Sequence, residues 1–95
     1  MHSIEELRAE IDRIDTAIVD LIAERQSCAG RMARAKYTEG LSIRDTSRRR
    51  QVLERAFDYA VERGVDPKAV QRVMELLVEM SEERQRECQG EGNLP

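Results

Sequence analysis

The residue whose position most strongly suggests chemistry is Arg25. Apolar residues recur at alternating steps of three and four along the first third of the chain and define one stripe of a helix: Ile4, Leu7, Ile11, Ile14, Ile18, Leu21, Cys28, Met32 and Ala35. Arg25 fills the stripe position between Leu21 and Cys28. A guanidinium on a buried stripe is costly to desolvate and needs a partner. That partner is either a carboxylate of the protein itself or a bound anion.

A second cation, Lys36, follows Arg25 on the same face of the predicted helix. The two residues differ by about 20° in projection and lie three turns apart. Together they could hold an anion from both ends, whereas the ordinary alternative is that both side chains extend into solvent. Arg8 lies about 100° around the helix from Arg25, so the two cannot easily serve one pocket within one copy of the chain. In a dimer Arg8 could reach the partner's pocket; by position alone, an ordinary solvated arginine is the favoured alternative.

Other polar residues lie where an apolar face or a helix start is expected. Ser81 and Gln85 share one face of the last helical segment, where they could hydrogen-bond a polar ligand. Alternatively, Ser81 is a small packing residue and Gln85 lies near a frayed end. The run from Arg44 to Arg50 contains four arginines, of which Arg49 should point inward. This run indicates an anion pocket or pairing with acidic residues rather than nucleic acid, because no aromatic residue is interleaved.

Capping signals divide the chain into three helices. The first begins after Ser3, which forms a capping box with Glu6, and runs to about Tyr37 or Thr38. The second begins after Asp45 and ends near Gly64. The third begins at the Asp66-Pro67 pair and runs to about Cys88. We therefore expect one helical domain over residues 1–88 and a disordered tail over residues 89–95.

The two later helices each have a predicted inner face. In the second helix it comprises Leu53, Ala56, Phe57, Ala60 and Val61, and in the third it comprises Val70, Val73, Met74, Leu77, Met80 and Ser81. The fold class expected is all-α, with one long and two shorter helices.

The length of the first helix predicts a homodimer. A helix of about 34 residues is roughly 50 Å long, whereas a compact chain of this size has a radius of gyration of about 12 Å. One end of the helix must therefore project beyond its own chain while its apolar stripe continues. A second copy is the economical cover, since no equally long second helix is visible.

Composition excludes several classes of protein. The 95 residues are 37% charged and 3% aromatic, and the net charge of −3 argues against general binding to nucleic acid. No stretch suggests a signal peptide or a membrane span, and the two cysteines suggest free thiols in the cytoplasm. There is no glycine-rich phosphate loop, no metal-ligand spacing and no Ser/His/Asp set. An enzyme of this sequence would work by binding and electrostatic complementarity, without a nucleophile, a metal or a cofactor.

Taken together, the motifs resemble the all-helical chorismate mutase family. The match comprises LRAEIDRID at 7–15, LIAER at 21–25, AK at 35–36, IRD at 43–45 followed by Arg48, LER at 53–55, and Ser81 with Gln85. The resemblance implies an intertwined homodimer that rearranges the dianion chorismate to prephenate for phenylalanine and tyrosine synthesis in the shikimate pathway. It also implies two equivalent pockets, each completed by an arginine from the neighbouring chain.

The resemblance also implies roles for the residues that could act on the substrate. Arg8 would be the arginine donated across the dimer, and Arg25 would bind a substrate carboxylate within its own chain. Lys36 and Gln85 would donate hydrogen bonds to the ether oxygen of the breaking bond. Such donors stabilise the transition state more than the ground state, while the arginines select the compact reactive conformer.

The remaining site residues include one departure from the family. The resemblance implies that Asp45 lies near the ring hydroxyl, that Arg48 lines the carboxylate end and that Ser81 hydrogen-bonds a carboxylate. Directly after the arginine matched by Arg48, the family usually carries a glutamate that accepts from the substrate hydroxyl. This chain has Arg49 there, which could pair with a nearby acid, swing outward or reshape that end of the pocket.

Two other functions remain open on the sequence alone. The first is isochorismate-pyruvate lyase, which resembles the same fold; the Arg44-Asp45 pair favours the mutases, whereas Arg49 keeps the lyase open. The second is a non-catalytic dimeric helical module with a regulatory role.

Overall fold

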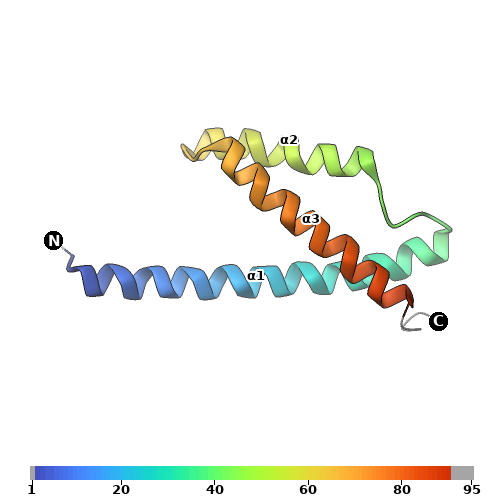
Figure 1. The fold of residues 1–95 in the computed structure, drawn as a ribbon, viewed down its shortest axis with the longest axis horizontal. Helices are drawn as coiled ribbons and strands as arrows, with labels where there is room; N and C mark the ends of the chain where they lie inside the picture. Colours follow the sequence, from blue (N-terminus) through green and yellow to red (C-terminus); the bar gives the residue numbers. More distant parts are fainter. Residues whose placement is uncertain (1, 91–95) are drawn as a thin grey trace.

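The structure, a computed structural model in which residues 2–90 are described, consists of three helices joined by two short connections (Figure 1). Helix α1 spans Ile4–Glu39, α2 spans Thr46–Arg63 and α3 spans Pro67–Gly90. No strand occurs within residues 2–90. The prediction of an all-α chain with one long and two shorter helices is therefore confirmed.

Local capping chemistry sets the helix boundaries. The side chains of Ser3 and Asp45 accept hydrogen bonds from the backbone N–H groups three residues later, and Asp66 accepts from the first turn of α3. Gly40 and Gly64 end α1 and α2 with φ of 70°, the left-handed conformation that glycine adopts without a steric penalty. Helix α1 extends one or two residues beyond the predicted end because the chain turns only at Gly40.

Helix α3 continues two residues further than the sequence suggested. Gln89 and Gly90 are helical, so the prediction that a disordered tail begins at residue 89 is wrong for these two residues. The side-chain amide of Gln89 donates to the backbone carbonyl of Ala33, 3.3 Å away, and this contact ties the last turn of α3 to α1. Residues 91–95 of the predicted tail lie outside the described residues.

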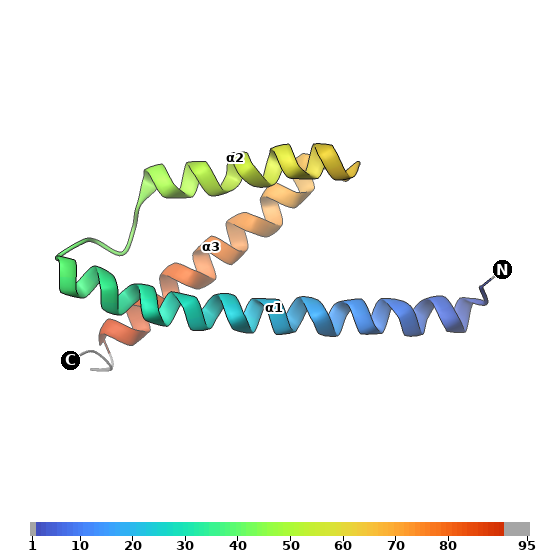
Figure 2. The same cartoon turned by 180° about the vertical axis from the view of Figure 1, so that it is seen from behind.

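Helix α3 holds the other two helices together. It begins beside the end of α2 and runs from there to cross the carboxyl-terminal half of α1, whereas α1 and α2 do not pack against each other within the described residues (Figures 1 and 2). The buried apolar residues lie at these two crossings: Ala29, Ala33, Ala60, Val78 and Cys88. Helices α1 and α3 pack closely at Gly30, where a Cβ would lie in ordinary van der Waals contact with the sulfur of Cys88, 3.7 Å away.

The amino-terminal half of α1 projects away from the rest of the chain. Every residue from His2 to Leu21 is exposed. This includes the apolar stripe, whose side chains have exposed fractions between 44% at Leu7 and 68% at Ile4. The molecule measures 56 × 26 × 14 Å with a radius of gyration of 16.7 Å, well above the roughly 12 Å of a compact chain of this length. A single copy therefore leaves half of its longest apolar stripe uncovered.

Two residues on the predicted inner faces are exposed instead. Val61 of α2 and Val73 of α3 are 57% and 59% exposed, while Val78, absent from the predicted face, is buried against α1. The reason is that α3 contacts two different helices along its length, so its buried face rotates from one contact to the next. Among the described residues, no helix is long and apolar enough to cross a membrane.

Candidate active site

A cavity of about 490 Å³ lies where the carboxyl-terminal half of α1 faces the start of α2 and the middle of α3. Seven of the eight residues singled out from the sequence line it: Arg25, Lys36, Asp45, Arg48, Arg49, Ser81 and Gln85. The eighth, Arg8, is exposed on the projecting half of α1, about 25 Å from Arg25 along the helix axis at 1.5 Å per residue. One chain thus brings the predicted site together except for Arg8.

Arg25 extends into the cavity from α1. It is not paired with a carboxylate of the described chain, one of the two partners that the sequence suggested. Its Nη1 donates to the backbone carbonyl of Leu77 in α3, 2.9 Å away, and within residues 2–90 it forms no ion pair. Burial lowers the pKa of Arg25, and the nearby positive charge of Arg48 lowers it further. The guanidinium stays charged at any physiological pH. It is therefore a partly desolvated cation beside an open cavity.

Lys36 lies about three turns beyond Arg25 on the same helix and is also half-buried. Its ammonium group donates to the backbone carbonyl of Ile43 in the connection between α1 and α2. A carbonyl compensates only part of the charge of a cation, and no carboxylate is paired with Lys36 in the part of the chain that is described. The ammonium can therefore still donate to a ligand in the cavity.

The α3 wall of the cavity presents neutral hydrogen-bonding groups. Gln85 is only 4% exposed, and its Nε2 donates to the hydroxyl of Ser81, 3.2 Å away. Its Oε1 is buried without a partner in the structure. Rotation of the amide by 180° would let Oε1 accept from the Ser81 hydroxyl and would put an N–H donor in the unpartnered position. A buried polar atom without a partner is costly, and a ligand atom in the cavity could satisfy it.

The start of α2 contributes the remaining polar wall. Asp45 caps the helix through Oδ1, which accepts from the backbone N–H of Arg48 at 3.0 Å. The guanidinium of Arg48 donates to Oε1 of Gln51 at 2.6 Å, three residues further along the same helix. Arg49 is half-buried, as its inward position in the sequence predicted. The ion pairs found in residues 2–90, His2–Glu6, Arg84–Glu87 and Arg86–Glu83, all lie outside this cavity.

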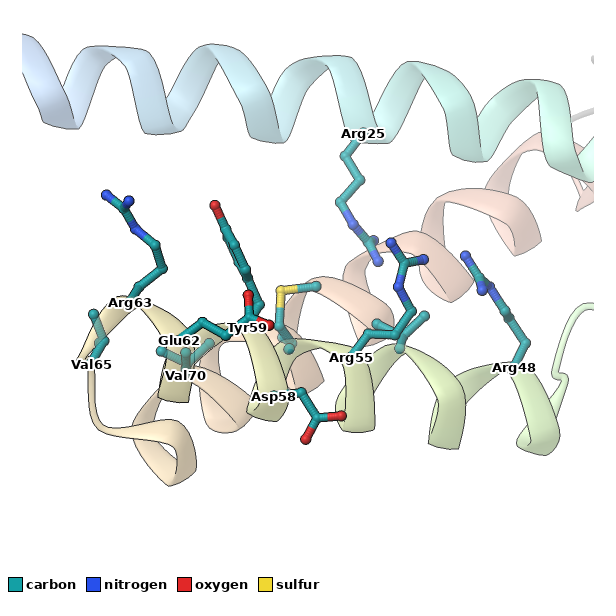
Figure 3. A pocket seen from close by; sticks show the side chains of 13 residues that line it. Arg25, Arg48, Arg55, Asp58, Tyr59, Glu62, Arg63, Val65 and Val70 are labelled. Atoms are coloured by element: carbon teal, nitrogen blue, oxygen red, sulfur yellow. The ribbon is translucent and has the colours of Figure 1, made fainter.

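A second, wider groove of about 810 Å³ adjoins the cavity between α1 and α2 and shares Arg25, Arg48 and Val52 with it. Figure 3 shows Arg25 extending from α1 toward α2, while Arg55 and Arg63 extend from α2 toward α1. Sequence reasoning missed these last two arginines as groove residues. The available signal was the spacing of Arg48, Val52, Arg55, Tyr59 and Arg63, which places them on one face of a helix.

The chemistry available in the cavity is that of an anion site. Four cations line it, namely Arg25, Lys36, Arg48 and Arg49, against the three carboxylates of Glu39, Asp45 and Glu82. No cluster of His, Cys, Asp and Glu suited to a metal ion occurs among the residues that the structure describes. Cations at both ends and neutral donors between them suit a small molecule with more than one carboxylate. The fold and the site together define a small all-helical protein with a largely cationic pocket.

The sequence profile of chorismate mutase type II matches residues 7–86, so the chain belongs to this family. The matched range includes every residue discussed above for the cavity and also Arg8.

Characterised relatives agree with this membership. A chorismate mutase of Methanocaldococcus jannaschii is 31% identical over 87 residues, which are 92% of this chain and 88% of the relative. The bifunctional chorismate mutase/prephenate dehydratase of Escherichia coli K12 is 31% identical over 79% of this chain, but the match spans only 19% of that protein. A 4-amino-4-deoxychorismate mutase of Streptomyces venezuelae is 27% identical over 81% of this chain and 75% of its own length.

Proposed function

We propose that this protein is a chorismate mutase, an isomerase that converts chorismate to prephenate in aromatic amino acid biosynthesis. The observation that carries the proposal is the convergence of Arg25, Lys36 and Gln85 on one cavity from α1 and α3. The rearrangement is unimolecular: the ether C–O bond breaks as a C–C bond forms within the same molecule. The protein therefore needs to supply neither a nucleophile nor a proton.

Binding would relieve an unfavourable arrangement in the free protein. Arg25 is partly desolvated and lies near the like charge of Arg48, which lowers its pKa. A carboxylate of the substrate would give the Arg25 guanidinium a charged hydrogen-bond partner, and Arg48 and Ser81 would hold the carboxylate end of the substrate. Fixing both carboxylates selects the compact conformer in which the two reacting carbons are close, and this lowers the entropic part of the barrier.

Rate acceleration would come from donors at the ether oxygen. Negative charge builds on that oxygen as the C–O bond breaks, so a donor placed there stabilises the transition state more than the ground state. Lys36 supplies a charged donor and Gln85 a neutral one, in the amide orientation that lets Oε1 accept from Ser81. Asp45 would lie near the ring hydroxyl.

We also propose that the active form is an intertwined homodimer. The projecting half of α1, residues 4–20, has an uncovered apolar stripe and carries six acidic and two basic residues. The groove between α1 and α2 is apolar at Val52, Ala56 and Met74 and is lined by four arginines but only two carboxylates. The helix of a second copy fits this groove in both polarity and charge, and it would bring the partner's Arg8 toward the cavity.

Incubation of the purified protein with chorismate tests the proposal. We expect prephenate to accumulate without any added metal or cofactor. Isochorismate should be tested as a second substrate. Arg49 occupies the position where the family usually has a glutamate, and isochorismate-pyruvate lyase is therefore the alternative activity. Release of pyruvate from isochorismate with no prephenate from chorismate would replace the mutase by the lyase. Turnover of neither substrate would favour the non-catalytic regulatory module.

The proposed setting is the cytoplasm. Cys28 and Cys88 are both free thiols in the structure, and unpaired cysteines are typical of a reducing compartment.

A further inference from the structure

Glu82 is a carboxylate of the cavity that has no role in the proposed mechanism. It lies on α3 between Ser81 and Gln85 and lines the same cavity as both. It is half-buried, whereas the other two carboxylates of the cavity, Glu39 and Asp45, are exposed. One oxygen of Asp45 already accepts from the backbone as a helix cap. Glu82 is thus the least solvated carboxylate that faces the proposed ligand.

No ion pair in the described chain accounts for the position of Glu82. The two arginines closest to it on α3 have other partners: Arg86 pairs with Glu83 at 2.9 Å, and Arg84 pairs with Glu87 at 3.4 Å. A half-buried carboxylate without a charged partner is unfavourable. Its presence at this position therefore suggests that a partner comes from within the cavity.

Arg49, on the α2 wall of the cavity, is a cation in the same situation as Glu82. It is half-buried, lines the same cavity and forms no ion pair within residues 2–90. The other cations of the cavity have hydrogen-bond partners: Arg25 binds the Leu77 carbonyl, Lys36 the Ile43 carbonyl and Arg48 the Gln51 amide. Arg49 and Glu82 are therefore opposite charges that share one partly desolvated space, and both have long, flexible side chains.

We propose that Glu82 is the acceptor for the ring hydroxyl of the substrate and that Arg49 is a positioning residue, which pairs with Glu82 and orients it. This inference rests on the proposed mutase function. The two residues would act together: the guanidinium of Arg49 holds one oxygen of the Glu82 carboxylate, and the other oxygen accepts from the hydroxyl. The hydrogen-bond acceptor for the ring hydroxyl thus comes from α3, and Arg49 on α2 holds that acceptor in place.

The first test compares two substrates with two variants. Glu82→Ala removes the acceptor, and the matched control Glu83→Ala removes the neighbouring glutamate, which is exposed and paired with Arg86 outside the cavity. The substrates are chorismate and its analogue without the ring hydroxyl. We expect Glu82→Ala to lower kcat/KM for chorismate by about 10- to 100-fold, the effect of losing one hydrogen bond to a charged acceptor. The analogue should react equally well with wild type and both variants.

Substrate dependence separates recognition from folding. A structural defect in Glu82→Ala would lower turnover of both substrates in parallel, and that result would overturn the proposal, as would a Glu82→Ala enzyme that matches Glu83→Ala on chorismate. Either result requires an active wild-type enzyme. Failure of the wild type to convert chorismate would instead refute the mutase function itself.

The second test measures the coupling between the two residues. Arg49→Ala should lower kcat/KM for chorismate by roughly 3- to 10-fold when Glu82 is present and should have no effect in the Glu82→Ala background. Arg49→Lys should restore part of the loss, because it keeps the charge without the planar fork of the guanidinium. Equal effects of Arg49→Ala in both backgrounds would show that Arg49 does not act through Glu82.

Discussion

Arg25 of α1 and Arg48 of α2 extend into the same space from opposite sides, and no carboxylate pairs with either one in the described residues (Figure 3). Burial, followed by the charge of Arg48, lowers the pKa of Arg25. The free protein therefore holds two like charges near each other beside an open cavity. Such an arrangement reduces stability and prepares the site for an anion.

Arg25→Met should separate stability from activity. The substitution keeps an unbranched apolar side chain, shorter than that of arginine, and removes a partly desolvated charge, at the loss of one hydrogen bond to Leu77. We expect a melting temperature equal to or above that of wild type, measured by circular dichroism, and a fall in kcat/KM of about 100-fold or more. Arg31→Met, at an exposed arginine of the same helix, should leave activity unchanged. A destabilised but active Arg25→Met protein would show that the arginine is structural.

Lys36→Ala should act mainly on kcat. If its ammonium stabilises charge on the ether oxygen, its removal should lower kcat by about 100- to 1,000-fold, while KM changes much less. Arg34→Ala is the control, because Arg34 is an exposed cation two residues away that does not line the cavity. A rise in KM with unchanged kcat would limit Lys36 to substrate binding.

Ile14→Glu should dissociate the proposed dimer. Ile14 is exposed in the single chain and lies on the apolar stripe of α1. A carboxylate there would be buried without a partner on assembly, which should shift sedimentation toward the monomer and abolish turnover. Thr16→Glu places the same charge on the opposite side of the helix, where the Thr16 hydroxyl donates to the backbone carbonyl of Asp12 one turn earlier. That variant should remain dimeric and active, and equal behaviour of the two variants would exclude this stripe as the interface.

Mixing Arg8→Ala with Arg25→Ala tests whether the site is shared. Each variant should be inactive alone, because both pockets of its dimer lack one arginine. A heterodimer would contain one pocket without either arginine and one intact pocket, so subunit exchange should restore part of the activity. If mass spectrometry shows that the subunits have exchanged but turnover does not recover, the contribution of Arg8 across the dimer is refuted.

The sequence predicted the elements of this fold because their ends are set by local chemistry. Ser3 and Asp45 cap the helices that they were expected to cap, and Gly40 and Gly64 end them. The buried faces were predicted less well. Apolar periodicity identifies a stripe but not the neighbour that covers it, so Ala29 and Ala33 contact α3 while much of the stripe on α1 stays exposed.

The site was predictable to the extent that it follows from helix faces and motifs. Arg25 and Lys36 were expected on one face of a helix, and the family membership implied by the motifs is confirmed. The position of Glu82 and the inward direction of Arg55 and Arg63 depend on how α3 crosses the other helices. Crossing geometry depends on packing between segments far apart in the chain, which one sequence does not reveal.

The exposed half of α1 has a consequence for how this chain acquires its structure. From His2 to Leu21 every residue is exposed, so little besides intrinsic helix propensity stabilises this segment in an isolated chain. In proteins most of the stability of a helix comes from packing of its apolar face, and in a single chain this segment has no such packing. If the proposed dimer forms, the amide protons of this segment should exchange quickly at high dilution and become protected as the protein concentration rises, because folding of the segment and association would then be one thermodynamic step.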